Sequence, residues 1–267
     1  MIRLREVLKP ETYGLFFQGN NLIIRNTINE SIVIEENINI LVSKDVNVKI
    51  VDLINNGNIS IESHANSSID YQIIDTVNTT RHFKCGGDLV INQICLSNSI
   101  EKLDVITNSV NANVIVNVLA IANNYDQTFK QTIDHQFSET ISNISNFGVA
   151  LDFANIVFDT TGIIEKGMNK SKCTQLSKGI ILDDTSSITS KPILLIDEYD
   201  CFANHGASIG KMSDDSLFYL MSRGLSKDEA FLLILEGIIS PFISKIEDEK
   251  LKESINKKLV TLIRGEK

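Results

Sequence analysis

The sequence has few of the residues that build disulfide or zinc frameworks. It contains no tryptophan, three prolines and four cysteines, and the cysteines lie far apart at positions 85, 95, 173 and 201. No two of them form a C-x-x-C pair, so their spacing fits neither a set of disulfides nor a structural zinc site. We therefore expect reduced thiols.

The chain also lacks a long apolar run and an excess of positive charge. Its most apolar stretch, residues 114–122, is interrupted by Asn117 and is far shorter than the roughly 20 residues of a membrane helix. The first residues interleave charged and apolar side chains, unlike a signal peptide. A net charge of −9 disfavours nucleic acid and anionic membranes as partners. These features predict a cytoplasmic protein.

What the chain has in abundance is short runs of Ile and Val, separated by Asn, Asp, Ser and Gly, from about residue 21 to residue 195. Such runs predict strands joined by turns. The candidate strands are residues 22–25, 32–35, 38–42, 46–51, 59–62, 69–74, 89–94, 105–106 and 114–122. No amphipathic helix separates them, which disfavours a doubly wound α/β fold and leaves a sandwich or a β-solenoid.

The strand lengths and corners favour the solenoid. Most candidate strands are short, their corners are rich in Asn, Gly and Ser, and Asn56-Gly57 is the one clear hairpin signal. In a solenoid, Ile and Val from successive coils stack into continuous interior ladders. The fold class that the sequence predicts is therefore mainly β.

A helical module follows residue 211. Ser213 can cap a short helix with an apolar stripe that includes Phe218, and Gly224 stands at the expected C-terminal cap. Ser226 and Glu229 have capping-box spacing before the run AFLLILEGII, which predicts a second helix that stops near Pro241. A charged segment and the run LVTLI complete the module.

On these signals alone, the module would cap an open end of the solenoid. The predicted division is an N-terminal segment (1–20), a β-helix core (21–212) and a C-terminal helical domain (213–267).

Three motifs between residues 191 and 246 occur in a fixed order: KPILLI, HGASIG and DDSLFYLMSRGLS. They resemble the C-terminal part of the SufB/SufD iron–sulfur cluster assembly proteins. Members of that family carry K-P-x-L-x-I, then H-G-A-T-x-G or H-E-A-T, then D-x-L-F-Y-L-x-S-R-G-[IL]-S. Upstream, HQFSETIS at 135–142 resembles the family element H-x-x-P-H-T-x-S, with Glu139 in place of the second histidine.

The resemblance implies a right-handed parallel β-helix with a C-terminal helical domain. It also implies pairing through the β-helix, as a homodimer or with a SufB/SufD paralogue, and docking of a SufC-like ABC ATPase on the helical domain. The chain is shorter than the usual bacterial members, which suggests a minimal or archaeal-type member. Its H-G-A form at His205 is SufD-like, and the thiol of SufB-like chains would fall at Leu176.

The cargo that the resemblance implies is a transient iron–sulfur cluster. Thiolate and imidazole ligate such clusters, and a carboxylate is tolerated where the cluster must be released. His205 matches the family's interface histidine. Cys173 lies three residues before Leu176, an offset that reverses the face of a strand. Glu139 stands where the family has histidine, and Cys201 precedes His205 by four residues.

The predicted iron ligands are thus His205, Cys173 and Glu139, with Cys201 as a further cofactor-binding thiol. A buried inert thiol remains the alternative for Cys201, and a solvated loop carboxylate remains the alternative for Glu139.

We expect a scaffold rather than an enzyme. The sequence lacks the spacing G-x-x-x-x-G-K-[ST], so the chain itself is not expected to bind nucleotide, and ATP chemistry would come from the partner. Phe218 and Leu232 are the predicted docking residues for that ATPase. Two alternatives stay open: a structural subunit without a cluster, and a β-helix enzyme acting on polysaccharide, for which only scattered carboxylates are present.

Overall fold

The computed structural model describes residues 1–4, 14–212 and 214–264. In these ranges the chain forms strands followed by three helices. The strands are β1 (Ile2–Arg3), β2 (Leu15–Gln18), β3 (Asn21–Ile24), β4 (Ile32–Ile34), β5 (Asn39–Val42), β6 (Asn47–Asp52), β7 (Asn58–Ser63), β8 (Ser68–Ile74), β9 (Thr80–Cys85), β10 (Asp88–Cys95), β11 (Ser99–Thr107), β12 (Asn113–Asn123), β13 (Asp126–His135), β14 (Ile141–Leu151), β15 (Asn155–Ile164), β16 (Lys172–Ile181), β17 (Ser187–Ile196) and β18 (Phe202–Lys211).

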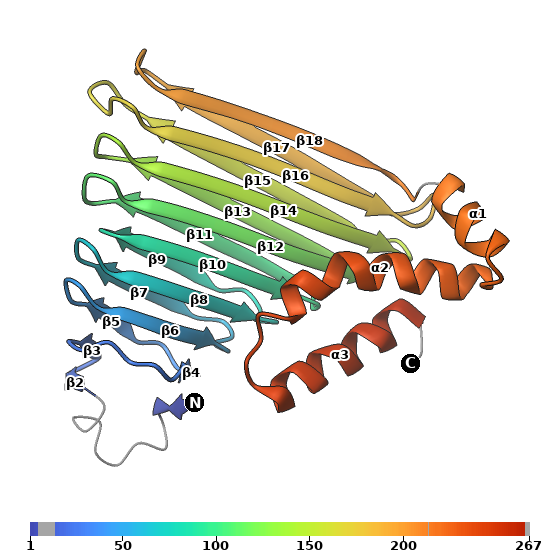
Figure 1. Ribbon diagram of the computed structural model, residues 1–267, viewed down its shortest axis with the longest axis horizontal. Helices are drawn as coiled ribbons and strands as arrows, with labels where there is room; N and C mark the ends of the chain where they lie inside the picture. The colour runs from blue at the N-terminus through green and yellow to red at the C-terminus, as the bar shows by residue number, and fades with distance from the viewer. Residues whose placement is uncertain (5–13, 213, 265–267) are drawn as a thin grey trace.

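The strands form two nine-stranded sheets. One has the order β1-β4-β6-β8-β10-β12-β14-β16-β18, and the other has the order β17-β15-β13-β11-β9-β7-β5-β3-β2. From β4 onward each strand pairs in parallel with the next but one, so the chain winds between the two sheets coil upon coil (Figure 1). The predicted solenoid, and the parallel β-helix that the resemblance implies, are confirmed.

Stacked side chains fill the interior between the sheets. One ladder runs through eight coils in direct register: Ile32, Ile50, Tyr71, Ile91, Val116, Ile144, Gln175 and His205. Its first six members are almost completely buried. The interior ladders predicted from the Ile and Val content are therefore present, and this one becomes polar in the last two coils.

The nine predicted strands overlap β3–β8 and β10–β12, and none extends more than one residue beyond the observed strand. The prediction missed β1, β2, β9 and β13–β18. In β9, β13 and β16 polar side chains occupy some of the interior positions. Asn56, the expected hairpin residue, instead turns a corner between β6 and β7, which lie in different sheets. It has the left-handed backbone that asparagine tolerates, with φ 53°.

The helices are α1 (Asp214–Ser222), α2 (Lys227–Ile243) and α3 (Glu249–Arg264). The capping box of Ser226 and Glu229 is formed, and Gly224 has a positive φ of 99°. Ser213 lies outside the described residues. Helix α2 ends near Pro241 as predicted, two residues beyond it. A proline in the last turn deprives only the carbonyl of Gly237 of a helical partner, and Gly237 is exposed to water.

The helical module does not cap the end of the solenoid as predicted. Helices α2 and α3 lie on the outer face of the sheet that runs from β1 to β18 (Figure 1). Leu235, Ile239 and Leu259 pack there against outward residues that include Ile74 and Leu119. Because these strands carry apolar residues on both faces, the outer face needs cover, and burying it stabilises the module at this position.

Polar contacts anchor the module to the same sheet. The Lys245 ammonium donates to Asn92 Oδ1 at 2.6 Å, and Lys258 pairs with Asp75 and donates to Ser97 Oγ at 2.7 Å. None of the described helices is long and apolar enough to cross a bilayer.

Candidate functional site at the open end of the solenoid

The two ends of the solenoid differ. At the N-terminal end the two-residue strand β1 and the antiparallel β2–β3 pair finish the sheets. At the other end β17 and β18 are full ten-residue strands, and within the described ranges each pairs on one side only. Their free edges present rows of backbone groups that a second chain can pair with. We call this coil the open end.

His205 lies on β18 at the open end, in register with Gln175 of β16. Partnered residues of parallel strands share a face of the sheet, and Gln175 faces the interior. Another pair of the same two strands supports this orientation. Gly179 faces the interior and is in register with Ile209, and a Cβ atom built on Gly179 would lie 3.4 Å from Ile209 Cγ1, so both residues point to the same side. His205 therefore continues an interior ladder, yet its side chain is exposed because no further coil covers it.

The interior becomes more polar toward this end. The ladder through Val114 continues with Ser142, Cys173 and Ala203, and the ladder through Val118 continues with Asn146 and Ser177. Cys173 is fully buried, and burial raises the pKa of its thiol. In the ladder through Val114 the last coils therefore hold hydroxyl and thiol groups where earlier coils hold Val48, Ile69 and Leu89.

Leu176, at the position of the SufB-like thiol, faces the outside of the sheet and is 37% exposed. Cys173 faces the interior, so the two positions lie on opposite faces, as their offset predicts. Cys173 is not a direct substitute for a thiol at Leu176.

Cys201 lies at the corner that leads into β18. It is half-buried, and its Sγ donates to the carbonyl oxygen of Glu198 at 3.1 Å. Its thiol pKa is raised by burial and by the nearby carboxylates of Glu198 and Asp200. The thiol form therefore predominates in the isolated chain.

Glu139 is exposed on an outer corner, with φ 59°, and its carboxylate lies 3.6 Å from Lys170 Nζ. Among the described residues, no three His, Cys, Asp or Glu side chains gather as a group that could hold a metal ion. The four predicted ligands are thus spread over the last coils rather than assembled within one chain.

The sequence motifs did not single out the buried His135 as a functional side chain. His135 Nδ1 lies 2.7 Å from Thr140 Oγ1, and Nε2 lies 2.8 Å from Ser142 Oγ. Burial lowers the pKa of His135 to about 4, so the ring is neutral at pH 7. All three residues belong to the HQFSETIS motif, whose hydroxyl residues were the available signal.

Large apolar side chains are exposed around the open end. They are Leu176, Ile193, Leu195, Ile196, Tyr199 and Phe202, and Tyr199 is completely exposed. Contiguous exposed apolar side chains beside free strand edges are typical of protein interfaces.

Comparison with known proteins identifies the family. The model of the SufBD core domain of the SUF iron–sulfur cluster assembly system matches residues 18–238. The chain belongs to the SufBD family. SufD of Bacillus subtilis is 35% identical over 129 residues, which are 48% of this chain and 30% of that protein. A SufBD family protein of Pyrococcus horikoshii is 32% identical over 115 residues, 40% of this chain and 25% of that protein. The matched segments thus span about a third of these relatives or less.

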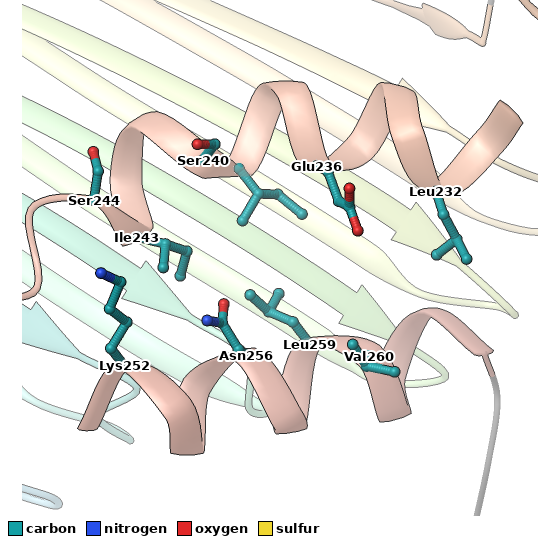
Figure 2. A pocket seen from close by; sticks show the side chains of 10 residues that line it. Leu232, Glu236, Ser240, Ile243, Ser244, Lys252, Asn256, Leu259 and Val260 are labelled. Carbon is teal, nitrogen blue, oxygen red and sulfur yellow. The ribbon is translucent and has the colours of Figure 1, made fainter. Parts of the chain in front are cut away.

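The helical module of this SufBD-family chain offers a second exposed surface. No residue of α1 is buried, and Phe218 is 74% exposed. Beside it, α2 and α3 enclose a groove of about 530 Å³. Leu232, Ile243 and Leu259 line this groove together with polar residues such as Glu236 and Lys252 (Figure 2).

Proposed function

We propose that this SufBD-family chain is a cytoplasmic scaffold on which a transient iron–sulfur cluster is assembled, and that His205 is one of its ligands. The observation that carries the proposal is the ladder that is apolar through six coils and ends in an exposed imidazole at an unpaired sheet edge. A neutral imidazole is a good ligand for iron. The cluster is the cargo of this scaffold.

The proposed scaffold is complete only when two chains pair at their open ends. Clusters are commonly held by four protein ligands, and one chain brings only part of such a set to its open end. Pairing through the β17 and β18 edges brings a second set, from a copy of this chain or from a paralogue, and covers the exposed apolar side chains. Within each chain Cys201 and the interior Cys173 are the thiolate candidates. Glu139, two coils away, is the carboxylate candidate.

The proposed partner is a SufC-like ABC ATPase that docks on the helical module and supplies the nucleotide chemistry. The support is α1, which has an exposed apolar stripe and no buried residue, next to the groove that Leu232 lines. Apolar faces of this kind bind helices of partner proteins.

The docking proposal predicts that Phe218→Asp combined with Leu232→Asp abolishes co-purification with the ATPase, because a carboxylate in an apolar contact costs several kcal/mol. Ile100→Asp is the matched control, since Ile100 is 61% exposed on β11, in the sheet opposite the one that the module covers. Far-UV circular dichroism must show that all variants keep their β structure. Unchanged co-purification of the folded double variant would contradict the docking site.

A structural subunit that carries no cluster is the second candidate. It is favoured by Leu176, which occupies the SufB-like thiol position, and by the separation of the predicted ligands within one chain. Anaerobic incubation of the purified protein with ferrous iron and sulfide separates the two candidates. A scaffold gains charge-transfer absorption and retains iron and sulfide through gel filtration, whereas a purely structural subunit retains neither.

A further inference from the structure

Gln175 holds a buried acceptor that has no partner. Its side chain is 3% exposed, and Nε2 donates to the carbonyl oxygen of Ile193 across the interior at 3.2 Å. The other amide atom, Oε1, is buried and has no hydrogen-bond partner among the residues that the structure describes. Leaving such an acceptor unsatisfied costs about 1–3 kcal/mol, so its persistence in the last coils needs an explanation.

Donors on its own strand are Cys173 and Ser177, and the Cys173 side chain bonds Ser142. The neighbouring coils supply the other candidates. Below Gln175 the same ladder holds the apolar Ile144, and above it holds His205. Two other polar residues of the last coil, Ser190 and Lys211, occupy register positions on the interior face. Ser190 is about 10 Å along β17 from the level of Ile193, and Lys211 pairs with Asp184 at the far end of β18. The imidazole of His205 is the donor that stands next to Gln175 on the same ladder.

Resting on the proposed function, we infer that Gln175 is a positioning residue for His205. When a second chain covers the open end, the imidazole loses water, and one ring N–H donates to Gln175 Oε1. This bond satisfies both groups and fixes the tautomer, so that the other ring nitrogen presents its lone pair to iron. Histidine ligands of metals are commonly oriented by such a second hydrogen bond. The bond from Nε2 to Ile193 holds the amide so that its oxygen stays available.

The tautomer of His205 tests the inference directly, without loaded cluster. Long-range ¹H–¹⁵N NMR of the paired protein at about pH 9, where imidazole is neutral, reports the tautomer ratio of each of the four histidines. The His205 signals are assigned with His205→Gln. Gln175→Met removes donor and acceptor, whereas Gln175→Glu keeps the acceptor and loses the bond to Ile193. If the Met variant does not fold, Gln175→Leu replaces it.

We expect one dominant tautomer in the wild type and a change of about fivefold in the ratio in Gln175→Met, which corresponds to about 1 kcal/mol. Gln175→Glu keeps an acceptor and should favour the same tautomer as the wild type. Gln131→Met is the matched control, because Gln131 is also an interior glutamine but bonds Asn146. It should lower the urea midpoint without changing His205.

An unchanged ratio in Gln175→Met overturns the inference. The inference is also overturned if Gln131→Met changes the His205 tautomer ratio as much as Gln175→Met does, or if Gln175→Glu changes it in the same way as Gln175→Met. Binding of ferrous iron alone, measured anaerobically on the same samples, separates this inference from the proposed function. If Gln175→Met changes the tautomer ratio but not the affinity for iron, the positioning role of Gln175 is supported and the ligand role of His205 is contradicted. If iron binds through His205 but the tautomer ratio does not change in Gln175→Met, the proposed scaffold function is supported and the positioning role of Gln175 is contradicted.

Discussion

At the scale of single residues, the molecule places polar groups inside a β-helix and satisfies most of them. Arg81 is almost completely buried and pairs with Asp52 at 2.7 Å and Glu101 at 2.6 Å. Tyr71 donates to the same Asp52 at 2.7 Å. Removing one member of such a buried set leaves an uncompensated charge, so these residues act as a unit.

The buried His135 predicts a pH dependence of stability. Its pKa is about 4 in the fold and about 6.5 in the unfolded chain. The unfolded state therefore binds a proton more readily, and stability is lost as pH falls from about 6.5 to about 4, by roughly 3 kcal/mol for a shift of this size. Urea denaturation across this range should show a shallower pH dependence in His135→Gln than in the wild type.

Equal pH slopes for the two proteins in that window would mean that His135 is protonated in the fold, contrary to this account. Carboxylates also titrate near pH 4, but they do so in both proteins, and the comparison removes their contribution.

Sequence motifs identified His205 but not its interior neighbours. The HGASIG motif singles out the histidine by resemblance alone. Gln175 and His135 gain their significance from register, because only the pairing of β16 with β18, and the return of β14 beside β13, shows which polar side chains face inward. A polar strand without an apolar face gives no signal for that direction.

At the scale of elements, strands were predictable where Ile and Val dominate and missed where the interior is polar. The helices were recognised from capping residues, but their place on the sheet was not. That place depends on outward apolar residues such as Ile74 and Leu119, which lie on strands whose other face is also buried. A strand that is buried on both faces is a continuous apolar run without alternation, so its sequence does not show that a second face needs to be covered.

The anchoring of α3 gives a prediction at this scale. Lys258→Met removes the ion pair with the largely buried Asp75 and should lower the free energy of unfolding by about 1 kcal/mol. Lys252→Met is the control, because Lys252 pairs at 3.5 Å with Glu249, which is 83% exposed, and should cost little. Urea midpoints measure both, and equal effects would contradict the anchoring role of Lys258.

At the scale of the whole molecule, the solenoid is asymmetric, with short strands at one end and full-length unpaired strands at the other. Long free edges with exposed apolar side chains promote aggregation unless a partner covers them. The proposed pairing of two chains at the open end is supported by this asymmetry.

The proposed pairing predicts a dimer that a single charged substitution in the interface dissociates. Leu195, 54% exposed on β17, should be covered in the dimer, so Leu195→Asp should give a monomer by light scattering at micromolar concentration. Ile100→Asp, at a residue 61% exposed on β11, should remain dimeric. A wild-type monomer, alone and with the ATPase, would rule out self-pairing at this end.

The central claim is that the open end holds an iron–sulfur cluster through His205. Its most direct test is the amount of iron and sulfide retained after anaerobic reconstitution of the wild type, His205→Ala and the control His64→Ala, with the urea midpoint measured on the same preparations. The account predicts a strong loss of iron and sulfide in His205→Ala alone, with a midpoint near that of the wild type, because the side chain is exposed. Wild-type iron content with a lowered midpoint in His205→Ala would show that this histidine is structural and would contradict the account.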